Sequence, residues 1–323
     1  MSEANHKRFA VCLAAYNGMA YISEQIKSIL VQENVDLQIF ISVDQSSDGT
    51  QIFLSEWAAR EPRLTLLDYG KRFGGAGPNF YRILREIQLE KFDYLSFADQ
   101  DDLWHPEKLF RAQCLMIEQS ALGYSSNFSA IWPNGQVRII NKAWPQRDWD
   151  YLFESAGPGC TYVLQKELAL SVQNLVQNSD DRLLSVDYHD WLIYAFARSH
   201  KFRWSIDNWS SMQYRQHNHN QLGVNSGWMP FWNRAKKIMN GYGFEQSLLI
   251  AEVLHINSLP IVQNGLRGGR LGYLWLALRA KHCRRKPIHQ WWFFIACILR
   301  AISKPYISAK SLSKYTQNDV CDT

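Results

Sequence analysis

The chain has none of the cysteine patterns that mark a disulfide scaffold or a structural zinc site. Its six cysteines are scattered over 323 residues, and no two of them form a CxxC pair. Small secreted domains carry a dense cysteine framework, and zinc-binding domains carry closely spaced cysteine pairs. The sequence therefore predicts reduced thiols inside a cell and excludes a disulfide scaffold.

A long apolar segment is also missing. The longest apolar run near the C-terminus, residues 291–299, has about half of the ~20 residues that a membrane-spanning helix needs. Residues 1–8 are polar, so we expect no secretory signal peptide there. These observations predict a cytoplasmic protein that does not cross a membrane.

Acidic residues are scarce in one part of the chain only. Residues 261–323 contain 11 lysines and arginines against 2 aspartates, whereas residues 1–260 contain 24 basic and 28 acidic residues. Tryptophans and phenylalanines are interleaved with these cations. Cations attract anionic lipid headgroups, and tryptophan suits the membrane interface. We therefore expect peripheral contact between this region and the inner face of the cell membrane.

The basic region has two other interpretations. Its aromatic side chains could pack on the rest of the protein and leave the cations in solvent, and this alternative stays open. A basic, aromatic segment could also bind nucleic acid. We do not expect a nucleic-acid partner, because no recognised nucleic-acid module accompanies the segment.

The first 120 residues alternate between short apolar runs and segments with apolar residues at helical spacing. Each run has the length of a buried strand, and each periodic segment has the single apolar face of a helix. This alternation predicts an α/β fold, with a mainly parallel sheet flanked by helices on both faces. The expected strands cover residues 9–14, 37–43, 64–67 and 94–98, and the expected helices begin near residues 22, 50, 78 and 106.

Three polar segments follow strands of the predicted sheet. They are residues 14–18, 44–49 and 99–102. In a parallel α/β sheet, the ligand site lies beyond the carboxyl ends of the strands. We therefore expect these segments to lie close together and to form the binding site, although they are far apart in the sequence.

The third segment, Asp99-Gln100-Asp101-Asp102, is an acidic turn. Three carboxylates within four residues repel one another unless a cation or solvent compensates their charge. Mg²⁺ and Mn²⁺ prefer oxygen ligands, and Mg²⁺ often binds through carboxylates together with substrate phosphates. The alternative is a solvated turn that caps the next helix. The position of the turn at the end of a strand favours the metal site.

Five stretches between residues 13 and 220 resemble glycosyltransferase family 2, the inverting enzymes of the GT-A fold. Within that family the chain is most similar to bacterial members of the rhamnosyltransferase type. The stretch DQDDLWHPEKL, residues 99–109, is quite specific, whereas AYNG or SSDGT alone is a weak signal. The matching stretches are residues 13–18, 42–50, 97–109, 188–191 and 214–220.

The resemblance implies three groups of site residues. Asp99 and Asp101 would form the family's DxD pair and bind a divalent metal, Mg²⁺ or Mn²⁺, with His217 as a third ligand. The implied residues for the nucleotide-diphosphate sugar donor are Ala14, Ala15, Tyr16, Asn17, Asp44, Gly77, Asn79, Asp99, Gln100 and Arg215. The implied residues for the acceptor are Gly159, Cys160, His189 and Trp191, with Cys160 as a small packing residue.

The sequence departs from the family's usual pattern at three positions. Val43 stands where the family often has a second acidic residue, and Gln45 stands where it often has glycine. Ala15 replaces the usual threonine, which removes one hydroxyl donor. The nucleoside preference therefore stays open.

A carboxylate is needed to accept the proton of the attacking hydroxyl group. Asp190 precedes an apolar segment and matches the position of the family's catalytic base. Spacing alone would instead favour an aspartate that stabilises a helix N-terminus. Asp187 and His189 are the rival candidates for the base.

The sequence thus predicts an inverting, metal-dependent hexosyltransferase. It would move a sugar, with rhamnose favoured, from a nucleotide-diphosphate donor to a hydroxyl group of a glycan or lipid-linked acceptor in bacterial surface polysaccharide synthesis. A metal-dependent nucleotidyltransferase and a non-catalytic sugar-nucleotide or membrane-binding protein remain alternatives. We expect a GT-A catalytic domain over residues 1–230 and a helical C-terminal extension over residues 231–323. Within that domain, the donor half would cover about residues 1–120 and the acceptor half about 121–230.

Overall fold

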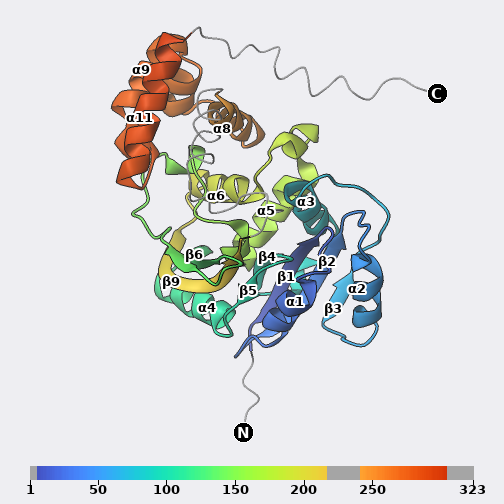
Figure 1. Ribbon diagram of the computed structural model, residues 1–323. Helices are drawn as coiled ribbons and strands as arrows, with labels where there is room; N and C mark the ends of the chain where they lie inside the picture. Colours follow the sequence, from blue (N-terminus) through green and yellow to red (C-terminus); the bar gives the residue numbers. More distant parts are fainter. Residues whose placement is uncertain (1–5, 217–240, 304–323) are drawn as a thin grey trace, which may run out of the picture. The chain divides into compact units, whose positions relative to one another are not determined.

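The computed structural model describes residues 6–216 and 241–303 (Figure 1). These residues form two compact units. The first unit holds residues 6–144, 155–179 and 188–216. The second unit holds residues 145–154, 180–187 and 241–303, so it takes in two short segments from the earlier part of the chain.

The first unit is built on a mixed sheet whose N-terminal half is parallel. In this half the order is β3-β2-β1-β4, and β1 pairs with β2 on one side and with β4 on the other. β1 is buried from its second residue to its last, which explains its continuous apolar sequence. The strands are β1 (Arg8–Ala15), β2 (Asp36–Val43), β3 (Leu64–Leu66) and β4 (Tyr94–Asp99).

The other half of the sheet brings in antiparallel strands. β8 pairs antiparallel with both β4 and β6, and β6 pairs parallel with β9. β5 pairs antiparallel with β9, and β7 pairs antiparallel with β6. The irregular pattern after residue 120 did not reveal this part of the sheet. These strands are β5 (Leu103–Trp104), β6 (Gly123–Ile131), β7 (Val137–Ile140), β8 (Val163–Gln165) and β9 (Trp204–Arg215).

Helices cover both faces of this sheet, which confirms the predicted α/β class. On one face Val11 of β1 lies in a core with Ile26, Leu54 and Met116 from three helices. On the other face the ring of Phe80 lies 5.4 Å from that of Phe97 in β4. The helices of the first face are α1 (Ile22–Leu30), α2 (Thr50–Ala58) and α4 (Lys108–Glu118). The helices of the second face are α3 (Ala76–Glu86), α5 (Lys166–Asn178) and α6 (His189–Ser199).

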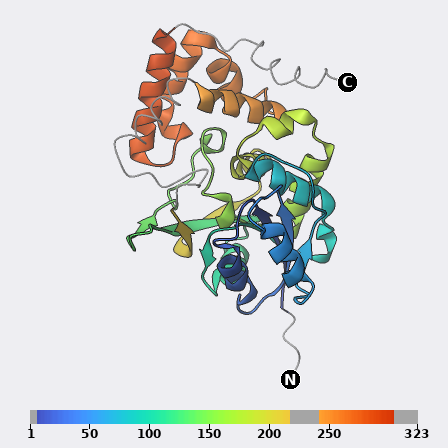
Figure 2. The same ribbon diagram turned by 45° about the vertical axis from the view of Figure 1, so that its right-hand side comes forward.

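The described part of the second unit consists of helices and short loops (Figure 2), as the sequence predicted for the C-terminal extension. Its core contains the ring of Phe293, which lies 4.8 Å from Phe153 and 5.8 Å from Phe244. None of the described helices is both long and apolar enough to cross a membrane. The main helices are α8 (Tyr242–Val253), α9 (Gly269–Leu278), α10 (Ala280–Cys283) and α11 (Pro287–Ile302).

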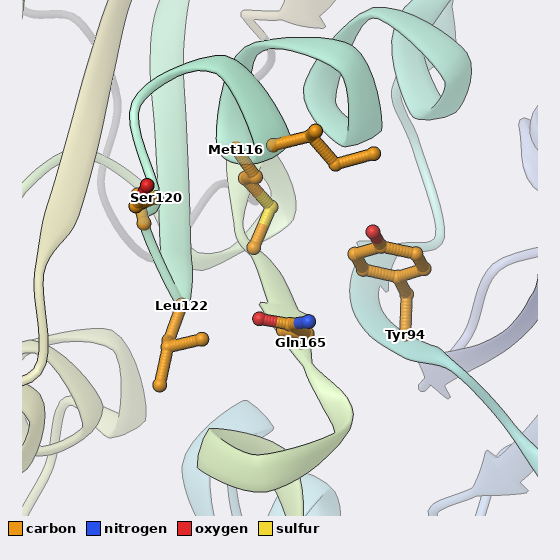
Figure 3. Close-up of a pocket in the computed structure, with 7 residues that line it drawn as sticks. Tyr94, Met116, Ser120, Leu122 and Gln165 are labelled. Carbon is orange, nitrogen blue, oxygen red and sulfur yellow. The ribbon is translucent and has the colours of Figure 1, made fainter.

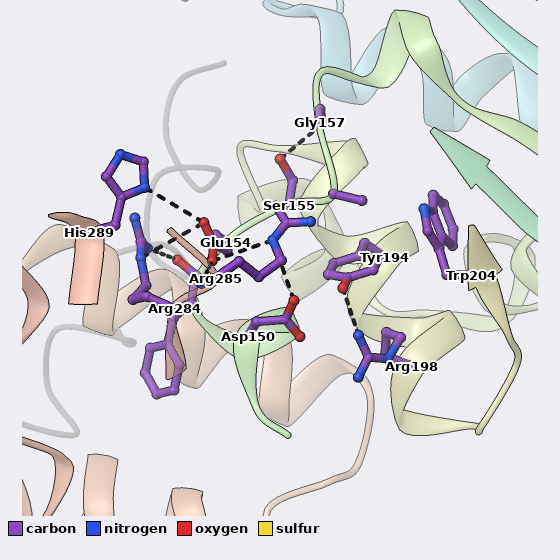
Figure 4. Close-up of polar contacts among 12 residues, drawn as sticks. Asp150, Glu154, Ser155, Gly157, Tyr194, Arg198, Trp204, Arg284, Arg285 and His289 are labelled. Carbon is purple, nitrogen blue, oxygen red and sulfur yellow. Dashed lines mark hydrogen bonds and ion pairs between the residues drawn. The ribbon is translucent and has the colours of Figure 1, made fainter. Parts of the chain in front are cut away.

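A buried ion network fastens residues 145–154 within the second unit (Figure 4). Arg285 Nε lies 3.4 Å from Asp150 and 3.5 Å from Glu154, and Arg284 approaches the same glutamate at 3.9 Å. Burial raises the pKa of Glu154, but the two arginines outweigh it and hold that pKa well below its usual value. Removing one member would leave the opposite charge buried without compensation, so the network locks this segment in place.

We predict that Gly123→Ala destabilises the first unit. A Cβ at this position would lie 2.2 Å from the ring of Trp204, which cannot yield because it packs on Tyr162 and Tyr194. Overpacking of this kind costs about 1–3 kcal/mol. Urea denaturation should show the loss as a lower midpoint.

The matched control is Gly243→Ala in α8. A Cβ there meets no atom of residues 6–216 or 241–303 within 4 Å, and alanine favours a helix over glycine. This variant should be as stable as the unmodified chain or slightly more stable. Equal stability of the two variants would contradict the packing argument.

Candidate active site

Hydrogen bonds tie the loop after β1 to the loop after β2. Gly18 N donates to Thr50 Oγ1 at 2.8 Å, and Met19 N donates to Asp48 at 3.0 Å. Burial raises the pKa of Asp48, but hydrogen bonds from Thr50 and Met19 outweigh it and keep that pKa below its ordinary value. The structure thus brings two of the three polar segments together and gives Asp48 a structural role.

The side chain of Gln100 joins the third segment to the first. Its Nε2 donates to Tyr16 O at 2.8 Å, and its Oε1 accepts from Tyr16 N at 2.7 Å. A Cβ on Gly18 would lie 2.5 Å from this Oε1, so glycine leaves room for the amide. Asn17 has a left-handed φ of 47° and accepts a hydrogen bond from Ser47 N. The amide of Gln100, which the sequence assigned to the donor, is therefore engaged by the backbone of Tyr16.

Asp44 lies at the end of β2 and is buried. Its carboxylate accepts hydrogen bonds from Phe73 N and Gly74 N, both at 2.9 Å. Its own backbone N–H donates to Ala15 O at 2.8 Å, and Ala14 and Ala15 are themselves buried. The glycine-rich loop before α3 is thus anchored on the carboxylate that the sequence assigned to the donor's nucleoside.

Gly77 and Asn79 lie in the first turn of α3, and both are buried. Asn79 Nδ2 donates to Ser42 O in β2 at 3.2 Å, while its Oδ1 has no hydrogen-bond partner within the described ranges. Arg82, one turn further on, donates to Ser42 Oγ at 3.0 Å. These contacts hold the start of α3 against the sheet.

The acidic turn folds against Cys160, which belongs to the short helix η3 (Gly159–Thr161). Ligand atoms of Asp99, Asp102 and Cys160 all lie within 4.8 Å of one another. Burial raises the pKa of Asp99 to about 7, with a further contribution from the charge of Asp101. Burial and the same neighbouring charge also raise the pKa of Asp102. The turn therefore carries carboxylates that resist full ionisation.

Lys108 lies beneath this turn and was not singled out from the sequence. Its side chain is fully buried, and Nζ donates to Cys160 O at 2.6 Å. The same Nζ lies 3.1 Å from the centre of the Trp104 ring. Burial lowers the pKa of Lys108 to about 7, against the opposing influence of Asp102 and Asp99. Its position in the sequence, six residues after Asp102 within DQDDLWHPEKL, could have pointed to Lys108 as a site residue.

The cluster fits a hard divalent cation. Asp102 is 1% exposed, and neither of its carboxylate oxygens has a hydrogen-bond partner among the described residues. A cation with oxygen ligands would satisfy these oxygens and relieve the repulsion between the carboxylates. The Cys160 thiol is a poor ligand here, because burial keeps its pKa well above the ordinary value. His217 lies outside the described residues.

Asp190 lies in the first turn of α6 and is nearly buried. Its Oδ1 accepts from Trp191 N at 2.7 Å, and burial raises its pKa to about 6. The charge of Asp190 also raises the pKa of Asp99, so these carboxylates lie within electrostatic range of each other. A carboxylate with a raised pKa next to a metal-type cluster is suited to accept a proton.

His189 packs inside the first unit. Its ring lies 4.3 Å from that of Phe80, and a Cβ on Gly159 would lie 2.2 Å from its Nε2. Burial lowers the pKa of His189 to about 3, so its ring is neutral near pH 7. Trp191 is also buried. His189 and Gly159, which the sequence assigned to the acceptor, therefore contact each other.

The structure also places two other residues named from the sequence, one of which, Arg215, lies two residues after the Gln213 that pairs with Leu103. Arg215, assigned to the donor, forms an ion pair with Glu24 and lies over the ring of Tyr21. Asp187, a rival for the base, belongs to the second unit and accepts a hydrogen bond from Tyr242.

A separate pocket of about 270 Å³ lies at the opposite end of β4 (Figure 3). Tyr94, which begins β4, lines it with Met116 and Gln165, whereas the acidic turn follows the last residue of that strand. Six residues of strand extend roughly 20 Å, so this pocket is remote from the acidic turn. Its lining contains no carboxylate, and we do not assign it to the site.

We predict that Lys108→Met destabilises the fold at neutral pH. The substitution removes the donor to Cys160 O and a cation whose charge acts on Asp99 and Asp102. Loss of a buried, hydrogen-bonded charge typically costs about 3 kcal/mol. Lys27→Met, at an exposed position in α1, is the control and should change the unfolding free energy by less than about 0.5 kcal/mol. Equal urea midpoints for both variants would refute the role given to Lys108.

Known proteins are similar to this chain in sequence and in fold. The family model "Glycosyl transferase family 2" matches residues 10–141. The chain is 38% identical over 288 residues to the dTDP-rhamnosyl transferase RfbG of Shigella flexneri, covering 89% of this chain and 99% of that protein. It is 26% identical over 162 residues to the glucosyltransferase WfgD of Escherichia coli, covering 49% of this chain and 60% of the other.

Two solved structures support the fold alone. Residues 1–349 of TarS from S. aureus, in complex with UDP-GlcNAc, superpose with a TM-score of 0.51 at 14% identity, covering 98% of this chain and 94% of that fragment. The mannosyltransferase PcManGT of Pyrobaculum calidifontis, in complex with GDP-Man and Mn²⁺, gives 0.51 at 15% identity, covering 92% and 86%. These likenesses agree with the GT-A arrangement.

The family and the sequence relatives disfavour nucleotidyl transfer and a non-catalytic role. The chain belongs to glycosyltransferase family 2 and is a glycosyltransferase.

Proposed function

We propose that the chain transfers rhamnose from dTDP-rhamnose to a hydroxyl group during the synthesis of a bacterial surface polysaccharide, with inversion at the anomeric carbon. The observation that carries this proposal is the acidic turn of Asp99 to Asp102, which lies within electrostatic range of the buried Asp190. The choice of sugar and nucleotide follows the relative from Shigella flexneri, which is similar over nearly the whole chain.

The acidic turn would hold a divalent cation through Asp99, Asp101 and Asp102, with His217 as a further ligand. When bound, this cation supplies the positive charge that stabilises the departing diphosphate. The chain's own residues shape the rest of the donor site. Gln100 fixes the backbone of Tyr16, and Asp44 fixes the glycine-rich loop, so both sides of the nucleoside site are rigid before the donor arrives.

Asp190 would act as the general base. Its carboxylate accepts the proton of the acceptor hydroxyl while that oxygen attacks the anomeric carbon and the bond to the diphosphate breaks. A single displacement inverts the anomeric centre and needs no covalent intermediate. Cys160 is therefore not required as a nucleophile, and its high pKa agrees with a packing role. His189 and Gly159 support Asp190 indirectly, because they fix the start of α6 against η3.

The acceptor would be a glycan or a lipid-linked saccharide at the inner face of the cell membrane. Gly159 and Cys160 precede β8, and Trp191 directly follows the base. These residues would contact the acceptor beside Asp190. Asp102 and Lys108 extend the set of site residues beyond those assigned from the sequence.

We predict that dTDP-rhamnose together with Mn²⁺ raises the melting temperature of the protein. A ligand that binds only the native state stabilises it by about 2.7 kcal/mol at one hundred times its Kd. Asp99→Asn should abolish this shift without lowering the stability of the ligand-free protein, because a neutral amide relieves repulsion within the turn. Asp68→Asn, at an exposed position, should keep the full shift. A full shift in Asp99→Asn would contradict the proposed metal site.

We predict that Asp190→Asn lowers kcat for rhamnosyl transfer by about 10²–10⁴-fold, the usual contribution of a general base. The amide can still accept the hydrogen bond from Trp191 N, so the fold and the donor-induced thermal shift should persist. Transfer is measured by release of the nucleoside diphosphate in the presence of acceptor.

The matched control is Asp187→Asn, which alters the neighbouring acidic side chain and should leave kcat within about twofold, because a surface substitution away from the reaction changes little. A pH profile gives a second readout. Because the pKa of Asp190 is about 6 and the ionised form is the base, kcat should rise with pH up to that value and then level off. A larger loss of kcat in Asp187→Asn than in Asp190→Asn would show that Asp190 is not the base.

A further inference from the structure

The helix α11 in the second unit has an apolar stripe whose members are exposed, apart from the half-buried Ile295. Its members recur at intervals of three or four residues from Ile288 through Trp291, Ile295 and Leu299 to Ile302. Trp291 is 58% exposed and Ile302 is 72% exposed. The stripe therefore covers one side of the helix along its whole length.

The opposite side of α11 packs into the second unit. Phe293, Cys297 and Ala301 are buried there. The exposed stripe is thus not a displaced core face, because the helix already buries a separate apolar side. An amphipathic helix normally turns charged or polar residues outward, and α11 instead has two apolar sides.

The neighbouring helix α9 repeats this arrangement. Leu271, Leu274 and Leu278 are exposed, and Leu278 reaches 80%, while Tyr273 and Leu276 on the other side are buried. Of the 18 large hydrophobic side chains that are exposed in the described part of the chain, 8 lie on α9 and α11. Soluble surfaces scatter such residues singly, so this concentration marks an interaction surface. We name it the α9–α11 face.

Cations lie at both ends of α9 and directly before α11. Residues 261–303 contain eight arginines and lysines and no aspartate or glutamate. Arg270 lies in the first turn of α9, Lys281 follows that helix in α10, and Lys286 directly precedes α11. Both Arg270 and Lys281 are exposed. The apolar stripes are therefore flanked at the helix ends by positive charge.

We propose that the α9–α11 face binds the surface of a membrane that contains anionic lipids. The leucines and isoleucines would enter the boundary between headgroups and acyl chains, and Trp291 and Trp292 would lie at the level of the headgroups. The flanking cations would attract the lipid phosphates. The helices are not long enough to cross the bilayer, so they would lie in its plane.

The charge near the α9–α11 face favours an anionic membrane over a second copy of the chain as the partner. Two copies joined through this face would bring the exposed Arg270 and Lys281 of each copy together, and residues 261–303 offer no carboxylate to pair with them. An anionic lipid surface supplies the missing negative charge. The inference rests on the proposed function in one respect, since it explains how the enzyme would meet a lipid-linked acceptor.

The test uses the full chain and sedimentation with lipid vesicles. Vesicles of phosphatidylcholine and phosphatidylglycerol should pellet the protein, and high salt should weaken the binding. The triple variant Leu271→Ser, Leu278→Ser, Trp291→Ser should bind at least tenfold more weakly. The control variant Ile52→Ser, Ile117→Ser changes two side chains of the first unit that are 67% and 63% exposed, and it should bind like the unmodified chain.

Three outcomes would overturn the proposal. They are equal binding by the triple variant, equal binding to pure phosphatidylcholine at all salt concentrations, and no binding by the unmodified chain. Light scattering adds a further check, because a doubled mass that the triple variant loses would show a second copy as the partner.

Consumption of dTDP-rhamnose with a water-soluble acceptor and without vesicles should be unchanged in the triple variant. Lack of this reaction in the unmodified chain would refute the proposed function, whatever the vesicles show.

Discussion

The repulsion among the carboxylates of one partly buried turn is the constraint on which the site depends. Asp99 and Asp102 cannot both ionise easily, because burial and the neighbouring charge of Asp101 raise the pKa of each. The fold places the buried Lys108 below them to offset part of this charge. A divalent cation would supply the positive charge that is still lacking. The repulsion within the turn and the proposed metal binding then have the same origin.

Asp48 and Asp190 differ in pKa because their local contacts differ. Asp48 accepts hydrogen bonds from Met19 and Thr50 and has a lowered pKa, so it stays ionised and holds two loops together. Asp190 is buried with fewer compensating donors, and its pKa of about 6 lies close to the pH at which a base must work. Hydrogen bonding and burial thus distinguish a structural carboxylate from the proposed base, although the two side chains are chemically identical.

The path of the chain connects the site to the second unit. Residues 145–154 and 180–187 belong to that unit, and each segment directly precedes a part of the site, namely residues 155–160 and 188–190. The ion network around Arg285 fixes the first segment at Asp150 and Glu154. Within the second unit, these contacts fix the stretch of chain that directly precedes residues 155–160 in the sequence.

The sequence by itself determined four strands and four helices of the first 120 residues, because their apolar periodicity is a local property of the chain, whereas it did not predict β5. It also determined the family, through stretches such as DQDDLWHPEKL. Only the tertiary structure decided that Gln100 bonds to Tyr16, that Lys108 lies under Cys160 and that His189 packs on Phe80. These contacts join residues from 52 to 109 positions apart, and the spacing of residue types does not encode them. Burial and pKa depend on such distant neighbours, so the chemistry of each carboxylate follows from the fold.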